Sequence, residues 1–277
     1  MQRTLNCAGR LIDVSSPKVM GILNLTPDSF YSKSRFSLDK ELLGQAEKMI
    51  RDGVTFIDVG GYSSRPGASF VSEKEELSRV VPAVVLLLKN FPDILISVDT
   101  FRSEVAKKGI EAGAVIVNDI SGGNLDEDMF KTIAQVQVPY VMMHLRGTPQ
   151  TMMQFTHYDD MMIDITRYFS EKIAQAQAAG INDIILDPGF GFAKTRQQNF
   201  EVLNHLEHFA ILEKPLLVGI SRKSMIYKTL QVSAHEAKNG TSVLNTIALL
   251  KGASILRVHD VKEAIETIRL VEEVSYK

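Results

Sequence analysis

Short runs of apolar residues alternate with longer amphipathic segments along almost the whole chain. We expect eight of these runs to be strands, at 19–23, 54–59, 94–98, 115–117, 139–143, 184–186, 215–219 and 254–258. The segments between them have helical spacing, and a helix at 243–250 is expected between the last two strands. Ser72 and Glu75, for example, form a capping box that begins a helix ending near Asn90. The runs are nearly all apolar, which is typical of parallel strands buried on both faces.

The number of strand–helix units predicts the fold class, which is α/β. Eight units in about 260 residues match the size of a (β/α)8 TIM barrel. An open doubly wound sheet is the alternative that the pattern leaves open. We find no linker or change in composition, so one domain over residues 1–277 is expected. Residues 2–17 precede the first unit and are predicted to form a hairpin that covers the barrel floor.

Composition and charge narrow the class of protein. The 277 residues carry a formal net charge of -2, with acidic and basic residues interspersed and no basic stripe that would suggest nucleic acid as a partner. Cys7 is the one cysteine, which excludes an internal disulfide. The longest apolar stretch, 80–88, contains Pro82 and is far shorter than the roughly 20 residues of a membrane span. We therefore expect a cytoplasmic protein with no membrane partner.

Polar residues follow several of the predicted strands. Asp99, Asn118 and Asp187 each end an apolar run, and Lys223 follows another. In a barrel, the loops at the carboxyl ends of the strands form the active site, so these side chains would converge. A single residue of this kind has a simpler interpretation, since Asp99 could cap the helix that follows it. His144 is expected to be a buried histidine whose hydrogen bonds are satisfied.

The residue types at these strand ends suit a flat heterocycle with an anionic group. Asp187 can accept two adjacent N–H bonds, Asn118 can donate and accept at once, and Lys223 can donate to a carbonyl oxygen. Arg65, Arg257 and His259 would add the positive charge that suits a phosphate or pyrophosphate. Arg222 is as well explained by a solvated surface position. The sequence has no P-loop, Gly-x-Ser-x-Gly elbow or Rossmann glycine pattern, which argues against those chemistries.

Eight motifs in a fixed order resemble those of one known family. They include Asn24-Leu25-Thr26-Pro27-Asp28-Ser29-Phe30, Gly60-Gly61 with Ser64-Arg65-Pro66-Gly67, Ser97-Val98-Asp99-Thr100, Asn118-Asp119-Ile120, Met143-His144 with Gly147-Thr148-Pro149, Asp187-Pro188-Gly189, Ser221-Arg222-Lys223-Ser224 and Arg257-Val258-His259-Asp260. Over residues 20–259 the chain resembles the dihydropteroate synthases of the pterin-binding (β/α)8 family. The resemblance implies that 6-hydroxymethyl-7,8-dihydropterin pyrophosphate and p-aminobenzoate are joined to give 7,8-dihydropteroate and pyrophosphate, with Mg2+ as cofactor.

The same resemblance implies a role for each matching residue. The expected pterin ligands are Asp99, Asn118, Met143, Asp187 and Lys223. The expected pyrophosphate ligands are Asn24, Ser64, Arg65, Arg257 and His259, with Asn24 also meeting the metal. The expected frame of the p-aminobenzoate pocket is Phe30, Ser64, Pro66, Lys223 and Ser224. Of these residues, Asp99, Asp187, Lys223, Arg257 and His259 would carry the catalysis. A homodimer and sensitivity to sulfonamides are implied as well.

Two loops depart from the family pattern. The first loop usually reads Phe-Ser-Asp-Gly-Gly, and here Ser32, Lys33 and Ser34 replace the acid and both glycines. The second loop usually reads Glu-Ser-Thr-Arg, where this chain has Tyr62-Ser63-Ser64-Arg65. The first change affects the closure of the loop. It also keeps open a non-catalytic pterin-binding homologue as an alternative function. A methyltetrahydrofolate-binding domain of a corrinoid methyltransferase shares the barrel and the pterin pocket, but it needs neither Ser221-Arg222-Lys223-Ser224 nor Arg257-Val258-His259.

Overall fold

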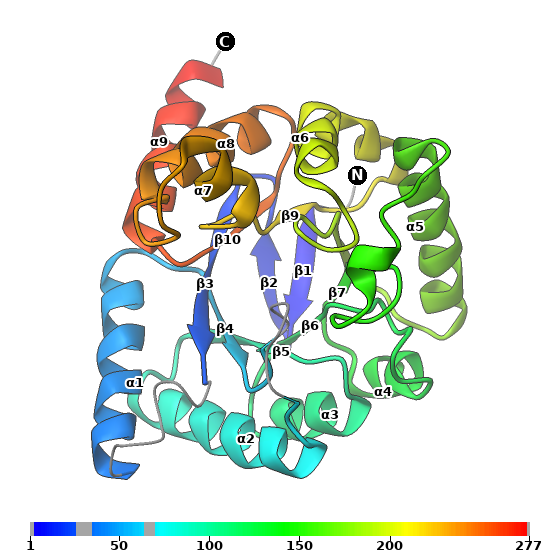
Figure 1. Ribbon diagram of the computed structural model, residues 1–277. Coiled ribbons are helices and arrows are strands. Elements are labelled where there is room, and N and C mark those ends of the chain that lie inside the picture. The colour runs from blue at the N-terminus through cyan, green and yellow to red at the C-terminus, as the bar shows by residue number, and fades with distance from the viewer. Residues whose placement is uncertain (1–2, 26–34, 64–69, 276–277) are drawn as a thin grey trace.

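Eight parallel strands form a nearly closed barrel with helices around it (Figure 1). The computed structural model describes residues 3–25, 35–63 and 70–275. The strands are hydrogen-bonded in the order β8-β7-β6-β5-β4-β3-β10-β9, and a parallel bridge between Leu186 and Leu216 joins the two ends. This closure confirms the predicted (β/α)8 barrel and excludes the open doubly wound sheet.

The barrel strands and the surrounding helices alternate along the chain. The strands are β3 (Lys18–Asn24), β4 (Phe56–Gly60), β5 (Leu95–Asp99), β6 (Ile116–Asp119), β7 (Tyr140–Met143), β8 (Ile184–Asp187), β9 (Leu217–Val218) and β10 (Ile255–Val258). The α-helices are α1 (Arg35–Arg51), α2 (Glu73–Asn90), α3 (Ser103–Glu111), α4 (Met129–Val136), α5 (Met161–Ala178), α6 (Arg196–Asn204), α7 (Ser224–Leu230), α8 (Lys238–Leu250) and α9 (Val261–Ser275). The described part of the chain also contains the 3-10 helices η2 (Met152–Gln154) and η3 (Leu206–Leu212), which lie in loops. Within the described residues, no helix has both the length and the apolar character needed to cross a bilayer.

An antiparallel hairpin covers the floor of the barrel, as predicted. It consists of β1 (Thr4–Cys7) and β2 (Arg10–Asp13), and Figure 1 shows it across the middle of the ring of helices. Leu5 and Cys7 of the hairpin pack in one cluster with a floor residue from each barrel strand. The backbone N–H of Asn6 donates to Asp183 just before β8, at 2.8 Å. The amino-terminal end of the barrel is therefore filled with side chains.

The barrel strands alternate between two environments, as the pleat of a β-strand requires. Outward-facing residues such as Ile57, Val98 and Leu186 pack against the helices. The inward-facing floor residues are Met20, Phe56, Leu95, Ile116, Val141, Ile185, Leu217 and Ile255. Two residues further along each strand, the inward-facing positions are Ile22, Asp58, Ser97, Asn118, Met143, Asp187, Gly219 and Arg257. A largely polar layer thus lies directly above an apolar floor.

The chain between β9 and β10 folds differently from the prediction. It contains a short helix, α7, that the periodicity does not indicate, and α8 begins at Lys238 rather than at 243. The reason is a close crossing of the two helices, because a Cβ at Gly240 would lie only 2.4 Å from Cγ2 of Ile226. Glycine, a weak helix former, allows this contact and lies inside the helix because of it.

Candidate active site

Most of the described residues expected to bind the substrate lie at the carboxyl ends of the strands. In the strand register, Asn24 pairs with Gly60, Gly60 with Asp99, and Asp99 with Asn118. Met143 pairs with Asp187 in the same way. Asp99 and His259 lie two residues beyond the inward positions of their strands, nearer the barrel mouth. Residues far apart in the sequence are therefore brought to one end of the barrel.

Arg257 connects two carboxylates inside this layer. Its Nε donates to Asp58 Oδ2 at 2.6 Å, and its Nη2 donates to Asp99 Oδ2 at 2.6 Å. Burial raises the pKa of Asp99 to about 7, against the opposing effect of Arg257. The pKa of Arg257 is also raised, because Asp58 and Asp99 outweigh the effect of its burial. Asp99 makes this ion pair instead of capping α3, whose N-cap is Arg102.

Asp58 is a residue of this cluster that the sequence motifs do not identify. Its side chain is fully buried, and Oδ2 accepts from Asn118 Nδ2 at 2.9 Å as well as from Arg257. It therefore holds one expected pterin ligand and one expected pyrophosphate ligand. The signal in the sequence is an aspartate inside an apolar strand, two residues after Phe56 and hence on the same face.

Asp187 and Lys223 form the other charged part of the site. Asp187 Oδ1 accepts from the N–H of Gly189 at 2.8 Å. Burial raises the pKa of Asp187, and the charge of Lys223 opposes this effect. Burial also lowers the pKa of Lys223 to about 8, with Asp187 opposing. The two groups thus influence one another within a buried site, which supports a joint role.

Gly219 leaves space between the two charged parts. An ideal Cβ at this position would lie 3.9 Å from Asp187 Oδ2 and 3.9 Å from Arg257 Cβ. It occupies an inward position at which six other strands carry a polar or charged side chain or methionine. The absence of a side chain at Gly219 leaves room beside both groups, where a flat ligand can approach them.

An apolar group of side chains lies beside the polar layer. Met143 is buried in a cluster with Ile120, Leu145 and Met152, and Phe192 packs against this cluster. Lys223 Nζ lies 4.8 Å from the centroid of the Phe192 ring and donates to the backbone oxygen of Phe190. Phe192 is a second residue that the site prediction missed. Its sequence signal is an aromatic residue just after the glycines of Gly189-Phe190-Gly191.

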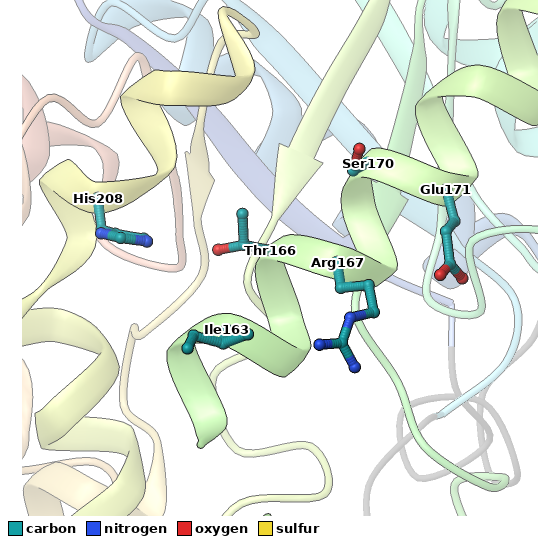
Figure 2. A pocket seen from close by; sticks show the side chains of 6 residues that line it. All are labelled: Ile163, Thr166, Arg167, Ser170, Glu171 and His208. Atoms are coloured by element: carbon teal, nitrogen blue, oxygen red, sulfur yellow. The ribbon is translucent and has the colours of Figure 1, made fainter. Parts of the chain in front are cut away.

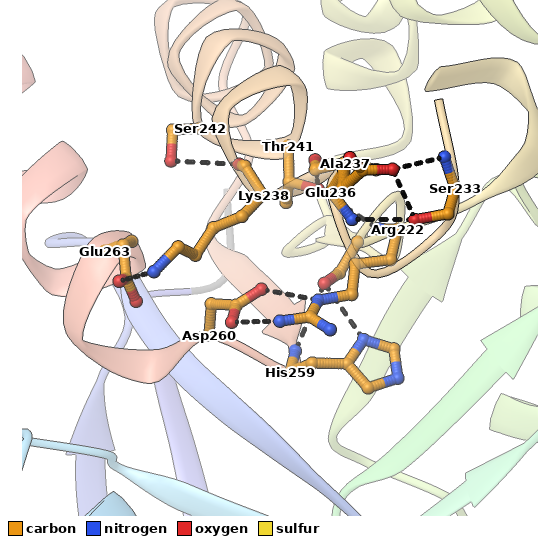
Figure 3. Close-up of polar contacts among 11 residues, drawn as sticks. Arg222, Ser233, Glu236, Ala237, Lys238, Thr241, Ser242, His259, Asp260 and Glu263 are labelled. Carbon is orange, nitrogen blue, oxygen red and sulfur yellow. Dashed lines mark hydrogen bonds and ion pairs between the residues drawn. The ribbon is translucent and has the colours of Figure 1, made fainter. Parts of the chain in front are cut away.

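His259 lies at the end of β10, and Arg222 lies in the loop after β9. The Ser221 hydroxyl accepts from the backbone N–H of His259 at 3.2 Å and lies 3.0 Å from its Nδ1. Donation of the hydroxyl proton to Nδ1 would place the ring proton on Nε2. Arg222 donates to both oxygens of Asp260, at 2.9 and 2.7 Å (Figure 3). The charge of Arg222 is therefore paired with Asp260, and His259 lies beside this ion pair at the barrel mouth.

Of the remaining expected residues, two are described by the structure and the others lie outside the described residues. Asn24 is exposed at the end of β3, and Ser224 is half-buried as the first residue of α7. Phe30, Ser64, Arg65 and Pro66 lie outside the described residues, as do Ser32, Lys33 and Ser34 of the altered first loop. The structure thus brings together Asp99, Asn118, Asp187, Lys223 and Arg257, with Met143 beside them. The roles of all these residues in binding stay predictions.

A surface hollow of about 440 Å³ lies away from these residues. It is lined by Ile163, Thr166, Arg167, Ser170, Glu171 and His208, which come from α5 and η3 (Figure 2). None of the residues predicted to bind substrate lines it. The candidate site is therefore the barrel mouth and not this hollow.

Comparison with known proteins identifies the family of this chain. The model of the family described as pterin binding enzyme matches residues 20–259. The dihydropteroate synthase of Escherichia coli (strain K12) is 44% identical over 266 residues, which cover 95% of this chain and 94% of that protein. A Yersinia pestis dihydropteroate synthase solved with a sulfonamide drug superposes with a TM-score of 0.92 at 42% identity, covering 99% of this chain and 100% of that one. A Xanthomonas albilineans dihydropteroate synthase solved with 4-aminobenzoic acid superposes with a TM-score of 0.92 at 34% identity over the full length of both chains.

Proposed function

Since the chain belongs to the pterin-binding enzyme family, we propose that it is a dihydropteroate synthase of folate biosynthesis. It transfers the pterinylmethyl group of 6-hydroxymethyl-7,8-dihydropterin pyrophosphate to the amine of p-aminobenzoate. The products are 7,8-dihydropteroate and pyrophosphate. A cytoplasmic location fits this reaction and stays a prediction.

A set of fixed carboxylates at the barrel mouth is the observation that carries this proposal. Arg257 holds Asp58 and Asp99, and the N–H of Gly189 holds Asp187 close to Lys223. Pyrophosphate leaves from a methylene attached to the electron-rich pterin, and positive charge develops on the ring. Fixed carboxylates in a buried site stabilise this charge without reorganising.

Recognition of the pterin follows from the groups around the space at Gly219. Asp187 has acceptor capacity left for the N–H edge of the amino-pyrimidinone, in addition to its bond from Gly189. Asn118 donates to Asp58 through one amide N–H, and its amide oxygen can accept from the ring. Lys223 donates to the ring carbonyl. The apolar side chain of Met143 packs on one face of the heterocycle.

Departure of pyrophosphate needs positive charge at the opposite end of the substrate. Arg257 has further N–H groups beyond the two that contact Asp58 and Asp99, and His259 lies two residues further along. We assign both to the pyrophosphate, together with Ser64 and Arg65. The aniline nitrogen attacks the methylene, and its proton leaves afterwards to water or pyrophosphate. No strong protein base is required for this step.

The donor at Asn24 fits the Mg2+ that the family implies. Its side chain is exposed at the end of β3, in the same register row as Asp99 and Asn118. Mg2+ prefers oxygen ligands and usually keeps several waters while binding substrate phosphates, so a single amide oxygen is a suitable protein contribution. When bound, the ion would neutralise charge on the leaving pyrophosphate.

The p-aminobenzoate is assigned to the rim of the site. Lys223 and Ser224 lie at the start of α7, next to the pterin pocket. Phe30, Ser64 and Pro66 complete the proposed frame from the two loops. We expect sulfonamides to compete with p-aminobenzoate for this pocket.

A homodimer is proposed on the basis of exposed apolar side chains on adjacent helices. The exposed residues Val243 and Leu250 lie on α8, and Leu270 and Val274 lie on α9. Apolar side chains gathered on neighbouring elements indicate an interaction surface. Light scattering should give twice the chain mass, and Leu270→Glu should reduce it to the monomer mass. A wild-type monomer at micromolar concentration would contradict the proposal.

The proposed reaction is tested by pyrophosphate release with both substrates and Mg2+. We expect release that depends on p-aminobenzoate, together with formation of 7,8-dihydropteroate. Asp187→Asn should abolish pterin binding in calorimetry while the far-UV circular dichroism stays that of the folded protein. Pterin binding without pyrophosphate release would instead favour the non-catalytic homologue, and binding of methyltetrahydrofolate alone would favour the corrinoid methyltransferase domain.

A further inference from the structure

A buried lysine near the end of the loop that follows β8 folds back onto that loop. Lys194 is 2% exposed, and its Nζ lies 3.1 Å from the backbone oxygen of Gly189 and 3.2 Å from that of Phe192. The third neighbour of Nζ is Nδ1 of His144, at 3.0 Å. His144 is buried, as predicted, and burial holds its pKa well below the usual value, so the ring is a neutral acceptor. All three partners of this buried lysine are therefore neutral acceptors.

The loop that Lys194 contacts has an unusual backbone. Between β8 and α6, here called the β8–α6 loop (residues 188–195), Gly189, Gly191 and Ala193 have φ values of +72°, +81° and +46°. A Cβ at Gly189 would lie 2.2 Å from the backbone oxygen of His144, so the loop is pressed against the end of β7. A backbone of this kind persists only where surrounding contacts fix it.

The two sides of this loop have different partners. Two of its carbonyl groups, at Gly189 and Phe192, face Lys194. A third carbonyl group of the loop, at Phe190, accepts from Lys223. The Phe192 ring lies beside the ammonium group of Lys223. The N–H of Gly189 also donates to Asp187. The conformation of one short loop thus determines the surroundings of both Asp187 and Lys223.

We propose that Lys194 is a positioning residue for the pterin pocket, acting through the β8–α6 loop on Asp187, Phe192 and Lys223. This inference rests on the proposed function, since it assigns a further residue to the same site. Without the N–H donors of Lys194, the Phe192 carbonyl group loses this partner and the Gly189 carbonyl group keeps the backbone N–H of Phe192. A buried carbonyl group is expensive to leave unsatisfied. The loop would relax, and the groups that contact the pterin would lose their alignment. Burial also lowers the pKa of Lys194 to about 7, yet both the charged and the neutral amine carry enough N–H groups for the two carbonyls.

The test compares two substitutions at this position with a control elsewhere. Lys194→Met keeps the length and apolar stem of the side chain but removes every N–H donor. Lys194→Gln keeps an N–H donor for a carbonyl group. Lys172→Met is the matched control, because Lys172 lies on α5 over the ring of Phe130 and outside the loop. Each protein is assayed for unfolding temperature, for the Kd of the pterin pyrophosphate by calorimetry, and for the KM of each substrate.

We expect Lys194→Met to raise the Kd of the pterin pyrophosphate by about 10- to 100-fold, the effect of losing one or two hydrogen bonds to a charged group. The KM of p-aminobenzoate should change less than the Kd of the pterin pyrophosphate, because Lys223 alone of the three affected groups also frames the p-aminobenzoate pocket. Lys194→Gln should show a smaller rise in Kd, and Lys172→Met should behave as the wild type.

A purely structural lysine gives a different result. In that case Lys194→Met would unfold at a lower temperature, but the folded protein would bind the pterin with wild-type affinity, and this outcome would overturn the proposal. If Lys194→Met does not fold, the Kd of Lys194→Gln decides the question by the same criterion. The proposed function fails separately if the wild type neither binds the pterin pyrophosphate nor releases pyrophosphate.

Discussion

Asp58 stabilises the centre of the site without being part of any of the motifs that end the strands. It accepts from Asn118 and from Arg257 through the same carboxylate oxygen. A buried arginine without its carboxylates would be strongly destabilising, because the ion has lost its hydration. Asp58 therefore sets the position of Arg257 before any substrate binds.

Replacing Asp58 with asparagine tests this contribution. Asp58→Asn keeps the shape and an acceptor for Asn118 but removes the charge that faces Arg257. We expect the free energy of unfolding to fall by about 2 kcal/mol, less than for a fully broken buried pair because Asp99 remains. Urea denaturation measures this change. Asp159→Asn, at a fully exposed position, should leave the stability unchanged, and an equally small effect of Asp58→Asn would contradict the assigned role.

The ionisation of Asp99 and Lys223 predicts a pH dependence of pterin binding. Asp99 has a pKa raised from 3.8 to about 7, so it is protonated and neutral below that pH. Lys223 has a pKa lowered to about 8, so it loses its charge above that pH. Affinity for the pterin alcohol, which lacks pyrophosphate, should be highest between about pH 7 and 8 and fall on both sides. Calorimetry across this range measures the profile.

A substitution separates the two limbs of this profile. In Lys223→Arg the cation keeps its charge at every accessible pH, so the alkaline fall should disappear while the acidic fall remains. A profile that is flat in the wild type would contradict the ionisation of both groups.

The raised pKa of Asp99 also makes the stability of the fold depend on pH. Between about pH 4 and 7 the folded protein holds a proton on Asp99 that the unfolded chain has lost, so this group favours folding less as the pH rises.

Single residues show how far the sequence could predict the site. Asp99, Asn118 and Asp187 could be identified because each ends an apolar run, and strand ends of parallel strands meet. Asp58 lies inside a strand, so only the two-residue alternation from Phe56 marks it as inward-facing. Its pairing with Arg257, 199 positions away, depends on side-chain packing that no local pattern reports.

At the scale of elements, the barrel strands combine a floor with a binding layer. On six strands the inward face carries an apolar residue at the floor and, two residues later, a polar residue or glycine, whereas Ile22 and Met143 are the exceptions. Stability and recognition are thus separated by two residues along most strands. This arrangement makes Gly219 a position where a side chain would compete with the ligand.

Gly219→Val should therefore impair binding more than folding. An added Cβ would make an ordinary contact of 3.9 Å with Asp187 and Arg257, so the fold should tolerate it. The valine methyl groups would occupy the space beside these groups and weaken pterin affinity by about tenfold or more, as overpacking does. Calorimetry and thermal unfolding measure both effects. Gly44→Val on the exposed face of α1, where a Cβ meets no neighbour, is the control. Wild-type affinity in Gly219→Val would place the pterin elsewhere.

The elements that the sequence did not predict have tertiary causes. The strands could be predicted because each is a short apolar run between helices. In contrast, α7 has only seven residues, which is too short for a periodic pattern, and it is followed by Gln231 in the left-handed conformation. The early start of α8 depends on the contact of Gly240 with Ile226, which is visible only once α7 is present.

At the scale of the whole molecule, the two ends of the barrel have different tasks. The hairpin closes the amino-terminal end, whereas the expected catalytic residues lie at the carboxyl ends of the strands, as is usual for this fold. The number of alternating units and the positions of the strand-end residues favoured this architecture over an open doubly wound sheet. The sequence could not predict which carboxylate each cation would pair with.

A core substitution in the hairpin tests this separation. Leu5 is fully buried in the floor, and Leu5→Ala should lower the free energy of unfolding by about 2–4 kcal/mol through the lost apolar surface and the cavity. Pterin affinity should stay that of the wild type. Leu11→Ala, on the same hairpin but 72% exposed, should change neither quantity. A large loss of pterin affinity in folded Leu5→Ala would show that the two ends are coupled.

The most direct test of the whole account is a crystal structure with the pterin pyrophosphate bound. We predict that the amino-pyrimidinone edge lies within about 3 Å of the Asp187 carboxylate and the Asn118 amide, in the space that Gly219 leaves open. The pyrophosphate should point towards His259 and Arg257. A pterin bound anywhere else on the molecule, with the barrel mouth empty, would contradict the account.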